Sequence, residues 1–381
     1  MKINFEQSPA QIELLKAIGS KDKNISFPAQ EALAALISPT IGEIYQQADT
    51  TQFLFKDWTF REDEDNSFPL ELFANVPEGY FSIWSSPMPG GVPSNTVHQV
   101  IEEVKFTTYR LDSAWNILAK YARAARFPIV EKAIERMLQE VLLKTNLAAW
   151  SVLLAAVAQA KNVVKGVEYG HVYATQTAGT LGLADYNKMI TLFRRMNASW
   201  VGGTPVNGAS RPTDFIVSPE MMEQFRALAY QPINTAGVGG VTATAATPLV
   251  MLPEAERERL YKGAGIPEFY GVNIIELLEL GKNQSYQLLF ENYIGGTQFP
   301  KLGSTTKDQD FDPSTDELVL MVDASRDIGL RAIATDADTG STFTMEADDQ
   351  FLKRSGKFGF FGGLEEGRIV LDSKGLSALV V

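Results

Sequence analysis

The residues with the clearest chemical potential are carboxylates in the last quarter of the chain. Asp308, Asp310 and Asp312 repeat the spacing that opens a calcium-binding loop. The sixth position of such a loop is Pro313 instead of glycine, and the twelfth is Val319 instead of glutamate. An EF-hand is therefore not predicted here.

A second acidic pair, Asp336 and Asp338, follows in the same region. From residue 308 to residue 349 twelve acids stand against two bases. This pattern fits a solvated acidic loop, which is the simpler interpretation, or a weak divalent-ion site. The second interpretation would make the chain a soluble metal-dependent hydrolase that uses the carboxylates of 308–312 or 336–338.

Other catalytic arrangements find little support. His98 and His171 are the two histidines, no G-x-S-x-G motif occurs, and cysteine is absent. Residues 362–368 have the glycine spacing of a phosphate loop but lack its Lys-[Ser/Thr] and contain two glutamates, so we predict a structural turn. We predict no catalytic residues, no cofactor, no metal and no enzymatic activity.

Composition narrows the class further. The 381 residues include 45% hydrophobic residues, enough for a sizeable core, and carry a net charge of -12. An acidic balance argues against a protein whose main task is to grip nucleic acid. The start of the chain has no apolar segment of a secretory signal, and the longest apolar run, 147–158, is too short to span a bilayer. We expect a soluble intracellular protein without a membrane segment.

The strongest predicted element is a helix over residues 128–161. Val130, Ile134, Met137 and Val141 recur at helical spacing, and 147–158 is apolar almost all round. At 1.5 Å per residue this helix is about 50 Å long. A helix of that length is a spine for the fold, and its second half must be covered on both sides.

Two extended segments precede this helix. Residues 1–50 form an N-terminal arm with short helices predicted at 9–18 and 28–37. Alternating aromatic residues from Phe53 to Phe60, and a second run at 97–111, predict a long two-stranded hairpin over 51–111. An isolated hairpin is marginal in water, so its aromatic side chains need another surface.

A compact α/β segment follows the helix. It contains a helix over 185–197, a buried strand at 214–217, a helix capped by Ser218 and a strand at 272–277. Further strands are predicted at 318–322, 327–333 and the C-terminus. We therefore predict an α+β fold.

Charge is distributed unevenly between these segments. Residues 49–78 contain eight acids and two bases, and residues 120–165 contain eight bases and three acids. The two regions are either solvated faces of opposite sign or complementary surfaces that meet, within one chain or between copies.

The order of parts resembles the major capsid protein of tailed bacteriophages with the HK97-type fold. Residues 214–222 (DFIVSPEMM) resemble the strand-to-helix step of that family. Residues 265–275 resemble the strand region after it, with an insertion-like departure at 268–271, and 289–294 (LFENYI) resemble the next strand.

The resemblance implies four parts and a role in assembly. The N-terminal arm would be 1–50 and the extended loop 51–111. The peripheral domain would be 112–183 and 311–381, with the spine helix at 128–161, and the axial domain 184–310. Subunits would form hexamers and pentamers of an icosahedral shell around double-stranded DNA.

On that basis the extended loop would lie across the peripheral domain of the adjacent subunit. The intersubunit contacts predicted in this way are Phe53, Phe55, Trp58, Phe60, Glu62, Asp63, Glu64, Asp65, Trp84, Arg123, Arg126, Lys132 and Arg136.

Further expectations follow from the same resemblance. The protein would be located in the virion after assembly in the host cytoplasm. Its partners would be other copies, a separate scaffolding protein, a portal and, in some systems, a decoration protein. The alternatives are an encapsulin-type nanocompartment shell and, from a different class, the metal-dependent hydrolase.

Overall fold

The structure is a computed structural model of the 381-residue chain. It describes residues 9–20, 22–47, 49–61, 67–70, 102–105, 107–124, 127–164, 167–196, 211–228, 268–269, 271–325, 328–336, 340–348 and 356–381. These form two compact units. Unit 1 takes the described residues of Met1–Phe73, Thr96–Ala149 and Gly329–Ile369, and unit 2 those of Trp150–Ile328 and Val370–Val381.

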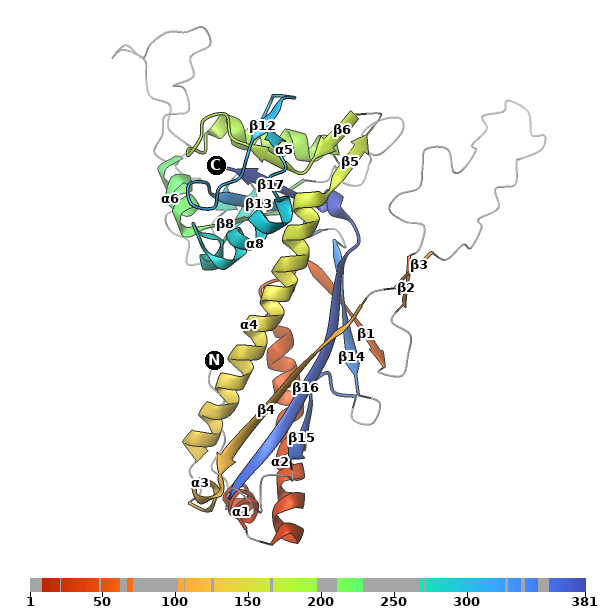
Figure 1. The fold of residues 1–381 in the computed structure, drawn as a ribbon, viewed down its shortest axis with the longest axis vertical. Helices are drawn as coiled ribbons and strands as arrows, with labels where there is room; N and C mark the ends of the chain where they lie inside the picture. Colours follow the sequence, from red (N-terminus) through yellow and green to blue (C-terminus); the bar gives the residue numbers. More distant parts are fainter. Residues whose placement is uncertain are drawn as a thin grey trace, which may run out of the picture. The chain divides into compact units, whose positions relative to one another are not determined.

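Unit 1 is built on a five-stranded sheet. The order is β1-β14-β16-β15, and β4 also pairs with β16. β1 runs parallel to β14, while β4 and β15 run antiparallel to β16. The strands are β1 (Phe55–Arg61), β4 (Tyr109–Leu118), β14 (Gly329–Thr335), β15 (Thr344–Asp348) and β16 (Lys357–Val370) (Figure 1).

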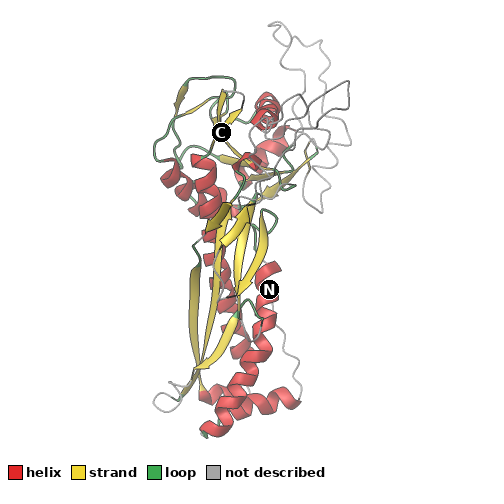
Figure 2. Cartoon of the chain, turned by 90° about the vertical axis from the view of Figure 1, so that its right-hand side faces the viewer, coloured by secondary structure: helices red, strands yellow, loops and turns green. Residues whose placement is uncertain are grey.

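Helices run alongside this sheet and close the core of unit 1 (Figure 2). Leu15, Ile18, Leu33 and Ile37 of the first two helices are buried with Phe358 of the sheet. The first two helices therefore belong to unit 1 and do not form a separate arm. The helices are α1 (Pro9–Ile18), α2 (Lys23–Gln47), α3 (Ala119–Arg123) and the first part of α4 (Phe127–Gln159).

Unit 2 is built on a six-stranded sheet with the order β7-β17-β13-β8-β10-β9. β17 lies antiparallel to β13, so the C-terminus is part of this sheet, as predicted. The strands are β7 (Val172–Ala174), β8 (Asp214–Val217), β9 (Glu268–Phe269), β10 (Val272–Glu276), β13 (Leu318–Val322) and β17 (Leu376–Val380). The sequence division placed β7, β13 and β17 in the peripheral domain, whereas backbone pairing puts them beside β8 in unit 2.

Helices and short ribbons complete the described part of the chain. Ser218 caps α6, because its Oγ accepts a hydrogen bond from the Met221 amide at 3.2 Å, which confirms the predicted cap. The helices of unit 2 are α5 (Leu183–Met196), α6 (Pro219–Leu228), α8 (Ser285–Ile294) and the single turns η1 (Leu278–Leu280) and η2 (Ser373–Gly375). The ribbons are β2 (Ser67–Leu70) with β3 (Glu102–Lys105), β5 (Lys161–Val164) with β6 (Val167–Gly170), and β11 (Phe299–Pro300) with β12 (Lys307–Gln309).

Helix α4 confirms the predicted spine. Its first half buries Ile134 and Leu138 in the core of unit 1, and in its second half Trp150 and Leu153 are buried within unit 2. Every residue from 147 to 158 is at least partly buried, as its apolar character predicts. By length and composition alone, Lys132–Gln159 is also apolar enough to cross a membrane. Of the most apolar stretch of this helix, 33% is buried within the described structure.

Two helices differ from the prediction. α2 continues through Pro39 to Gln47, because Leu33, Ile37 and Ile41 form one buried stripe on both sides of the proline. Residues 289–294 are not a strand but the end of α8. Tyr286, Phe290 and Ile294 recur every four residues on its buried face, and Gly295 ends the helix in a left-handed conformation with φ of 54°.

The glycine-rich segment 362–368 is not a turn but lies within β16. A Cβ atom added at Gly362 would stand 2.6 Å from Cζ of Phe343. Glycine is present there because an aromatic ring packs against the backbone, and not because the chain turns.

The predicted hairpin over 51–111 is also different in the structure. Among the described strands, β1 pairs with β14, more than 250 residues away in the sequence, and not with β3 or β4. Among the described residues of 51–111, β2 and β3 are the strands that pair with each other, as an antiparallel ribbon. Tertiary pairing therefore overrides the local hairpin at its base.

Candidate assembly surface

The aromatic residues at the base of the extended segment divide into two groups. Phe55 and Phe60 are each 3% exposed and buried inside unit 1. The centre of the Phe55 ring lies 5.4 Å from the guanidinium carbon of Arg368. The ring also packs against the backbone of Gly329, because a Cβ atom added at Gly329 would lie 2.5 Å from Cδ1 of Phe55. The prediction that Phe55 and Phe60 contact a neighbouring subunit is therefore wrong, because this chain provides their surface.

The other two described aromatic residues, Phe53 and Trp58, remain available for a contact with a neighbouring subunit. Phe53 is 37% exposed, and Trp58 is partly buried with its ring stacked 5.8 Å from that of Phe60. Both stay predictions. Trp84 lies outside the described residues, as do the acidic residues Glu62, Asp63, Glu64 and Asp65 and the base Arg126.

Helix α4 presents a row of charged side chains. Lys132, Arg136, Glu140 and Lys144 are four residues apart and exposed, so they lie along one face of the helix. We call Lys132, Arg136 and Lys144 the basic row. Leu143 beside it is 62% exposed. The described part of the basic surface predicted from the sequence therefore includes these three bases, with Glu140 between Arg136 and Lys144.

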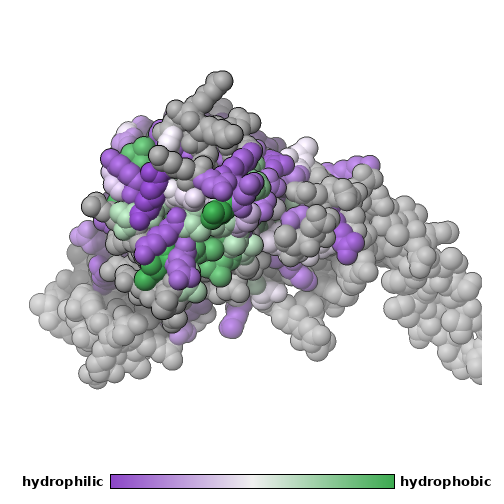
Figure 3. Space-filling view, turned by 90° about the horizontal axis from the view of Figure 1, so that it is seen from below, coloured by the Kyte–Doolittle hydropathy of each residue, from purple (hydrophilic) through white to green (hydrophobic). Residues whose placement is uncertain are grey.

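Arg123, also predicted as a contact, has a structural partner. Its Nε donates a hydrogen bond to the Gly19 carbonyl oxygen at 2.6 Å and so joins α3 to the end of α1. Figure 3 looks onto this end of unit 1, where hydrophobic residues lie among hydrophilic ones. Ile25 and Leu118 are exposed apolar residues on the neighbouring α2 and β4.

At the base of the extended segment lies a group of charged side chains, most of them buried, that we call the ion cluster. It consists of Asp49, Asp57, Arg331, Glu366 and Arg368. Arg331 on β14 is the centre: its Nε lies 3.0 Å from Glu366 Oε2, and its Nη1 lies 3.6 Å from Asp49 and 3.7 Å from Asp57. Asp57 stands directly opposite Arg331 in the β1–β14 ladder.

Arg368 fastens the segment before β1 to the same cluster. Its Nη2 donates to Asp49 Oδ2 at 2.7 Å, and its Nη1 donates to Thr51 Oγ1 at 2.7 Å. The Tyr109 hydroxyl donates a hydrogen bond to Glu366 from β4, the strand that pairs with β16 at this position. Charged groups on three strands and one connecting segment, together with a hydroxyl group from a fourth strand, thus hold β1 in place.

The carboxylates of the cluster differ in their electrostatics. Burial opposes ionisation of Asp49, but Arg368 and the hydrogen bonds from Thr51 outweigh it, so the pKa of Asp49 lies below its ordinary value. Burial raises the pKa of Asp57, Arg331 acts against this shift, and the neighbouring carboxylates of Asp49 and Glu366 add to it. Asp49 is therefore a firmly paired ion, and Asp57 is a poorly compensated one.

Sequence reasoning missed this cluster. Asp49 and Asp57 were counted only as part of an acidic segment, and Arg331 only as a base among acids. The available signal was Arg331 itself, because a charge in the apolar run LRAIA of a buried strand needs a partner. The identity of that partner depends on the fold.

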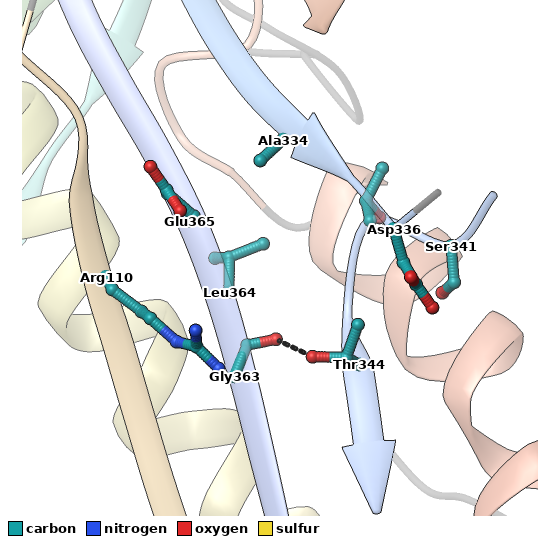
Figure 4. Close-up of a pocket in the computed structure, with 9 residues that line it drawn as sticks. Arg110, Ala334, Asp336, Ser341, Thr344, Gly363, Leu364 and Glu365 are labelled. Atoms are coloured by element: carbon teal, nitrogen blue, oxygen red, sulfur yellow. Dashed lines mark hydrogen bonds between the residues drawn. The ribbon is translucent and has the colours of Figure 1, made fainter. Parts of the chain in front are cut away.

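A small polar hollow lies on the same unit, between β4, β16, β14 and the start of β15 (Figure 4). Thr344 Oγ1 donates to the Gly363 carbonyl at 3.2 Å, and Arg110 Nε pairs with Asp112 at 2.8 Å. The polar groups are thus already engaged, and they do not converge on a ligand. The residues that line this hollow are Arg110, Ala334, Asp336, Ser341, Thr342, Thr344, Gly363, Leu364 and Glu365.

The carboxylates considered for metal binding are not brought together. Asp308, Asp310 and Asp312 lie on β12 and the turn after it, and Asp312 accepts hydrogen bonds from the Ser314 amide and hydroxyl at 2.9 and 2.6 Å. These hydrogen bonds lower the pKa of Asp312. Within the part of the chain that the structure describes, no three acidic or histidine side chains are grouped to hold a metal ion. Asp338 lies outside that part.

His171 is a buried structural residue of unit 2. Its Nδ1 is 2.6 Å from the Leu376 carbonyl oxygen, which fixes the proton on Nδ1 in the neutral ring. Its Nε2 is buried without a hydrogen-bond partner. Burial lowers the pKa of this histidine, and His98 lies outside the described residues.

Comparisons with known proteins find similar solved structures. The chain resembles the cyanophage P-SCSP1u capsid structure (13% identity, 87% of this chain and 88% of that chain, TM-score 0.49). It also resembles a chain of Mycobacterium phage Patience (14% identity, 91% and 87%, TM-score 0.45). A third is the holo-SrpI encapsulin complex from Synechococcus elongatus PCC 7942 (12% identity, 87% and 88%, TM-score 0.42). No protein-family model matches the sequence, and the search of curated proteins finds no match.

Proposed function

We propose that this chain is a self-assembling shell subunit, the major capsid protein of a tailed bacteriophage with an HK97-type fold. The observation that carries the proposal is helix α4. It is 33 residues long, is buried within both units and still exposes a basic row on unit 1. A solvated basic face on a chain with a net charge of -12 is suited to acidic surfaces of other copies.

The arrangement of the chain around α4 supports the same proposal. The order of elements along the chain follows the resemblance: an extended segment, the spine, an α/β unit and strands that return at the C-terminus. In this proposal unit 1 is the peripheral domain and unit 2 the axial domain. Phe53, Trp58 and the acidic residues 62–65 lie against the basic row of the adjacent subunit.

Assembly by this route needs many modest contacts repeated round a ring. Each contact joins different surfaces of two copies, so closure of the ring sums their free energies. The resulting particle would be located in the virion after assembly in the host cytoplasm, around double-stranded DNA. A scaffolding protein, a portal and a decoration protein are the further partners that the resemblance implies.

Static light scattering of the purified full chain tests the proposal. The expected result is a population of particles in the megadalton range, at least tens of copies of the 41.9 kDa chain. A stable species of one chain at all concentrations would contradict it. Nuclease-protected DNA in particles isolated from the producing cell would support the capsid, and an enclosed protein cargo would support the encapsulin alternative.

A further inference from the structure

Glu317 is a buried carboxyl group of unit 2 that forms no ion pair with any described residue. The residue is 4% exposed and stands directly before β13. Among the described residues, Lys282 is the cation that acts on it, but Lys282 is exposed and its effect is smaller than that of burial. A carboxylate that leaves water without a cation beside it keeps its desolvation cost. The fold therefore disfavours the ionised form of Glu317.

The hydrogen bonds of Glu317 are concentrated on one of its two oxygens. Oε2 accepts a hydrogen bond from the Ser218 hydroxyl at 2.7 Å, and Gln287 Nε2 lies 3.5 Å from the same oxygen. Oε1 is buried and accepts no hydrogen bond from the described residues. Oε1 of Gln287 is also buried without a donor, while its Nε2 donates to the Asp316 carbonyl oxygen at 3.3 Å. Two head groups in contact thus each carry an acceptor without a donor, and a proton on Glu317 is the donor that they lack.

This site joins two helices to the C-terminal strand. The Ser218 hydroxyl accepts a hydrogen bond from the Met221 amide at the start of α6 and donates one to Glu317. Gln287 lies on α8. The backbone of Glu317 exchanges two hydrogen bonds of 2.9 Å with Val381, the residue after β17. The state of this one carboxyl group therefore acts on α6, α8 and β17 together.

We propose that Glu317 is a proton-operated latch, whose protonated form holds the start of α6, α8 and the end of β17 together and whose ionised form loosens them. This inference goes beyond the proposed function and does not depend on whether copies of the chain assemble. The latch is closed at low pH. It opens as pH rises, because loss of the proton leaves a buried negative charge and removes a hydrogen-bond donor.

The electrostatics of the site agree with this geometry. Burial raises the pKa of Glu317 above its ordinary value of 4.5, and the hydrogen bond from Ser218 acts against this shift. The folded chain therefore binds this proton more tightly than the unfolded chain. The stability that the latch contributes is complete below about pH 4.5 and is lost as pH rises through the raised pKa. The charged groups that face or adjoin Glu317 are Glu220 on α6, Lys282 before α8, Asp316 beside it in the chain and the carboxylate of Val381.

Thermal unfolding of the full chain between about pH 4.5 and pH 8 tests the latch with the variant Glu317→Gln. Glutamine keeps the shape of the side chain and donates from its amide, so it resembles the protonated carboxyl group at every pH. We expect the melting temperatures of variant and wild type to agree near pH 4.5 and to diverge as pH rises, with the variant about 2–4 °C higher at pH 8. The matched control is Glu291→Gln, because Glu291 is an exposed glutamate on α8. The control should follow the wild-type curve.

Hydrogen exchange of the wild-type chain, measured by mass spectrometry, locates the effect without a variant. After correction for the intrinsic pH dependence of exchange, the amides of 219–228 and 376–381 should exchange about fivefold faster at pH 8 than near pH 4.5. The amides of α2 in unit 1 should show no such change. Glu317→Gln should remove the difference in 219–228 and 376–381.

The outcomes decide for or against the latch. A difference in melting temperature between Glu317→Gln and wild type that is the same at every pH would mean that glutamine changes packing and that no proton is involved. A wild-type exchange pattern that does not respond to pH would mean that the carboxylate is satisfied in its ionised form. Either result overturns the latch, and if Glu317→Gln does not fold, the wild-type exchange profile decides alone. Absence of particles in light scattering bears on the proposed function and leaves the latch unaffected.

Discussion

Replacement of Arg331 by methionine is the sharpest test of the buried charges in unit 1. Methionine matches the length of the arginine stem but removes the guanidinium group that contacts Glu366, Asp49 and Asp57. Arg331 and Glu366 are 1% and 0% exposed, so water cannot replace the lost partner. Breaking such a buried pair costs about 3–5 kcal/mol. We expect Arg331→Met to lower the free energy of unfolding of unit 1 by an amount in this range.

A double-mutant cycle with Glu366→Gln separates pairing from packing. The neutral amide of Glu366→Gln does not need a cation beside it. The free energy of unfolding of the double variant should therefore be about 2 kcal/mol higher than the sum of the two single losses predicts. Urea unfolding, monitored by tryptophan fluorescence under conditions where the chain is monomeric, provides the measurement. Lys132→Met is the matched control, because Lys132 is exposed and its loss should change stability by less than about 0.5 kcal/mol. A cost below about 1 kcal/mol for Arg331→Met, with additive effects, would refute the reasoning.

Two further predictions concern other parts of the fold. Burial lowers the pKa of His171 below its unfolded value of 6.5, so the unfolded chain binds the extra proton first and stability falls as pH drops below about 6.5. Thermal unfolding at several pH values should show this loss, and His171→Gln should reduce it; an equal slope in the variant would exclude the histidine as its source. Gly362→Ala should destabilise unit 1 by about 1–3 kcal/mol, because the new Cβ lies 2.6 Å from the Phe343 ring, whereas Gly170→Ala meets no atom within 4 Å and should be neutral in the same denaturation assay. Equal costs at both glycines would contradict the packing argument.

Elements with a strong local pattern could be predicted from the sequence. The spine was placed within two residues of α4, because its apolar residues recur at helical spacing over many turns. The strand at 214–217 and the cap at Ser218 were also confirmed, since both depend on neighbouring residues alone.

Features that depend on distant pairing could not be predicted. Alternation of aromatic residues indicated a strand at 53–60, but nothing local shows that β14 lies beside it. For the same reason Phe55 and Phe60 were assigned to a neighbouring subunit when they are buried in their own. The ion cluster has partners from four separate segments, so only the fold brings Asp49, Arg331 and Arg368 together.

Electron microscopy of the purified assembly product tests the central claim most directly. Self-association through repeated contacts between different surfaces predicts uniform closed shells with icosahedral symmetry, made of this chain alone or with a scaffolding protein. Open filaments would show that the contacts do not close. Micrographs that show only single chains, even at high protein concentration, would contradict the proposal that the chain assembles into a shell.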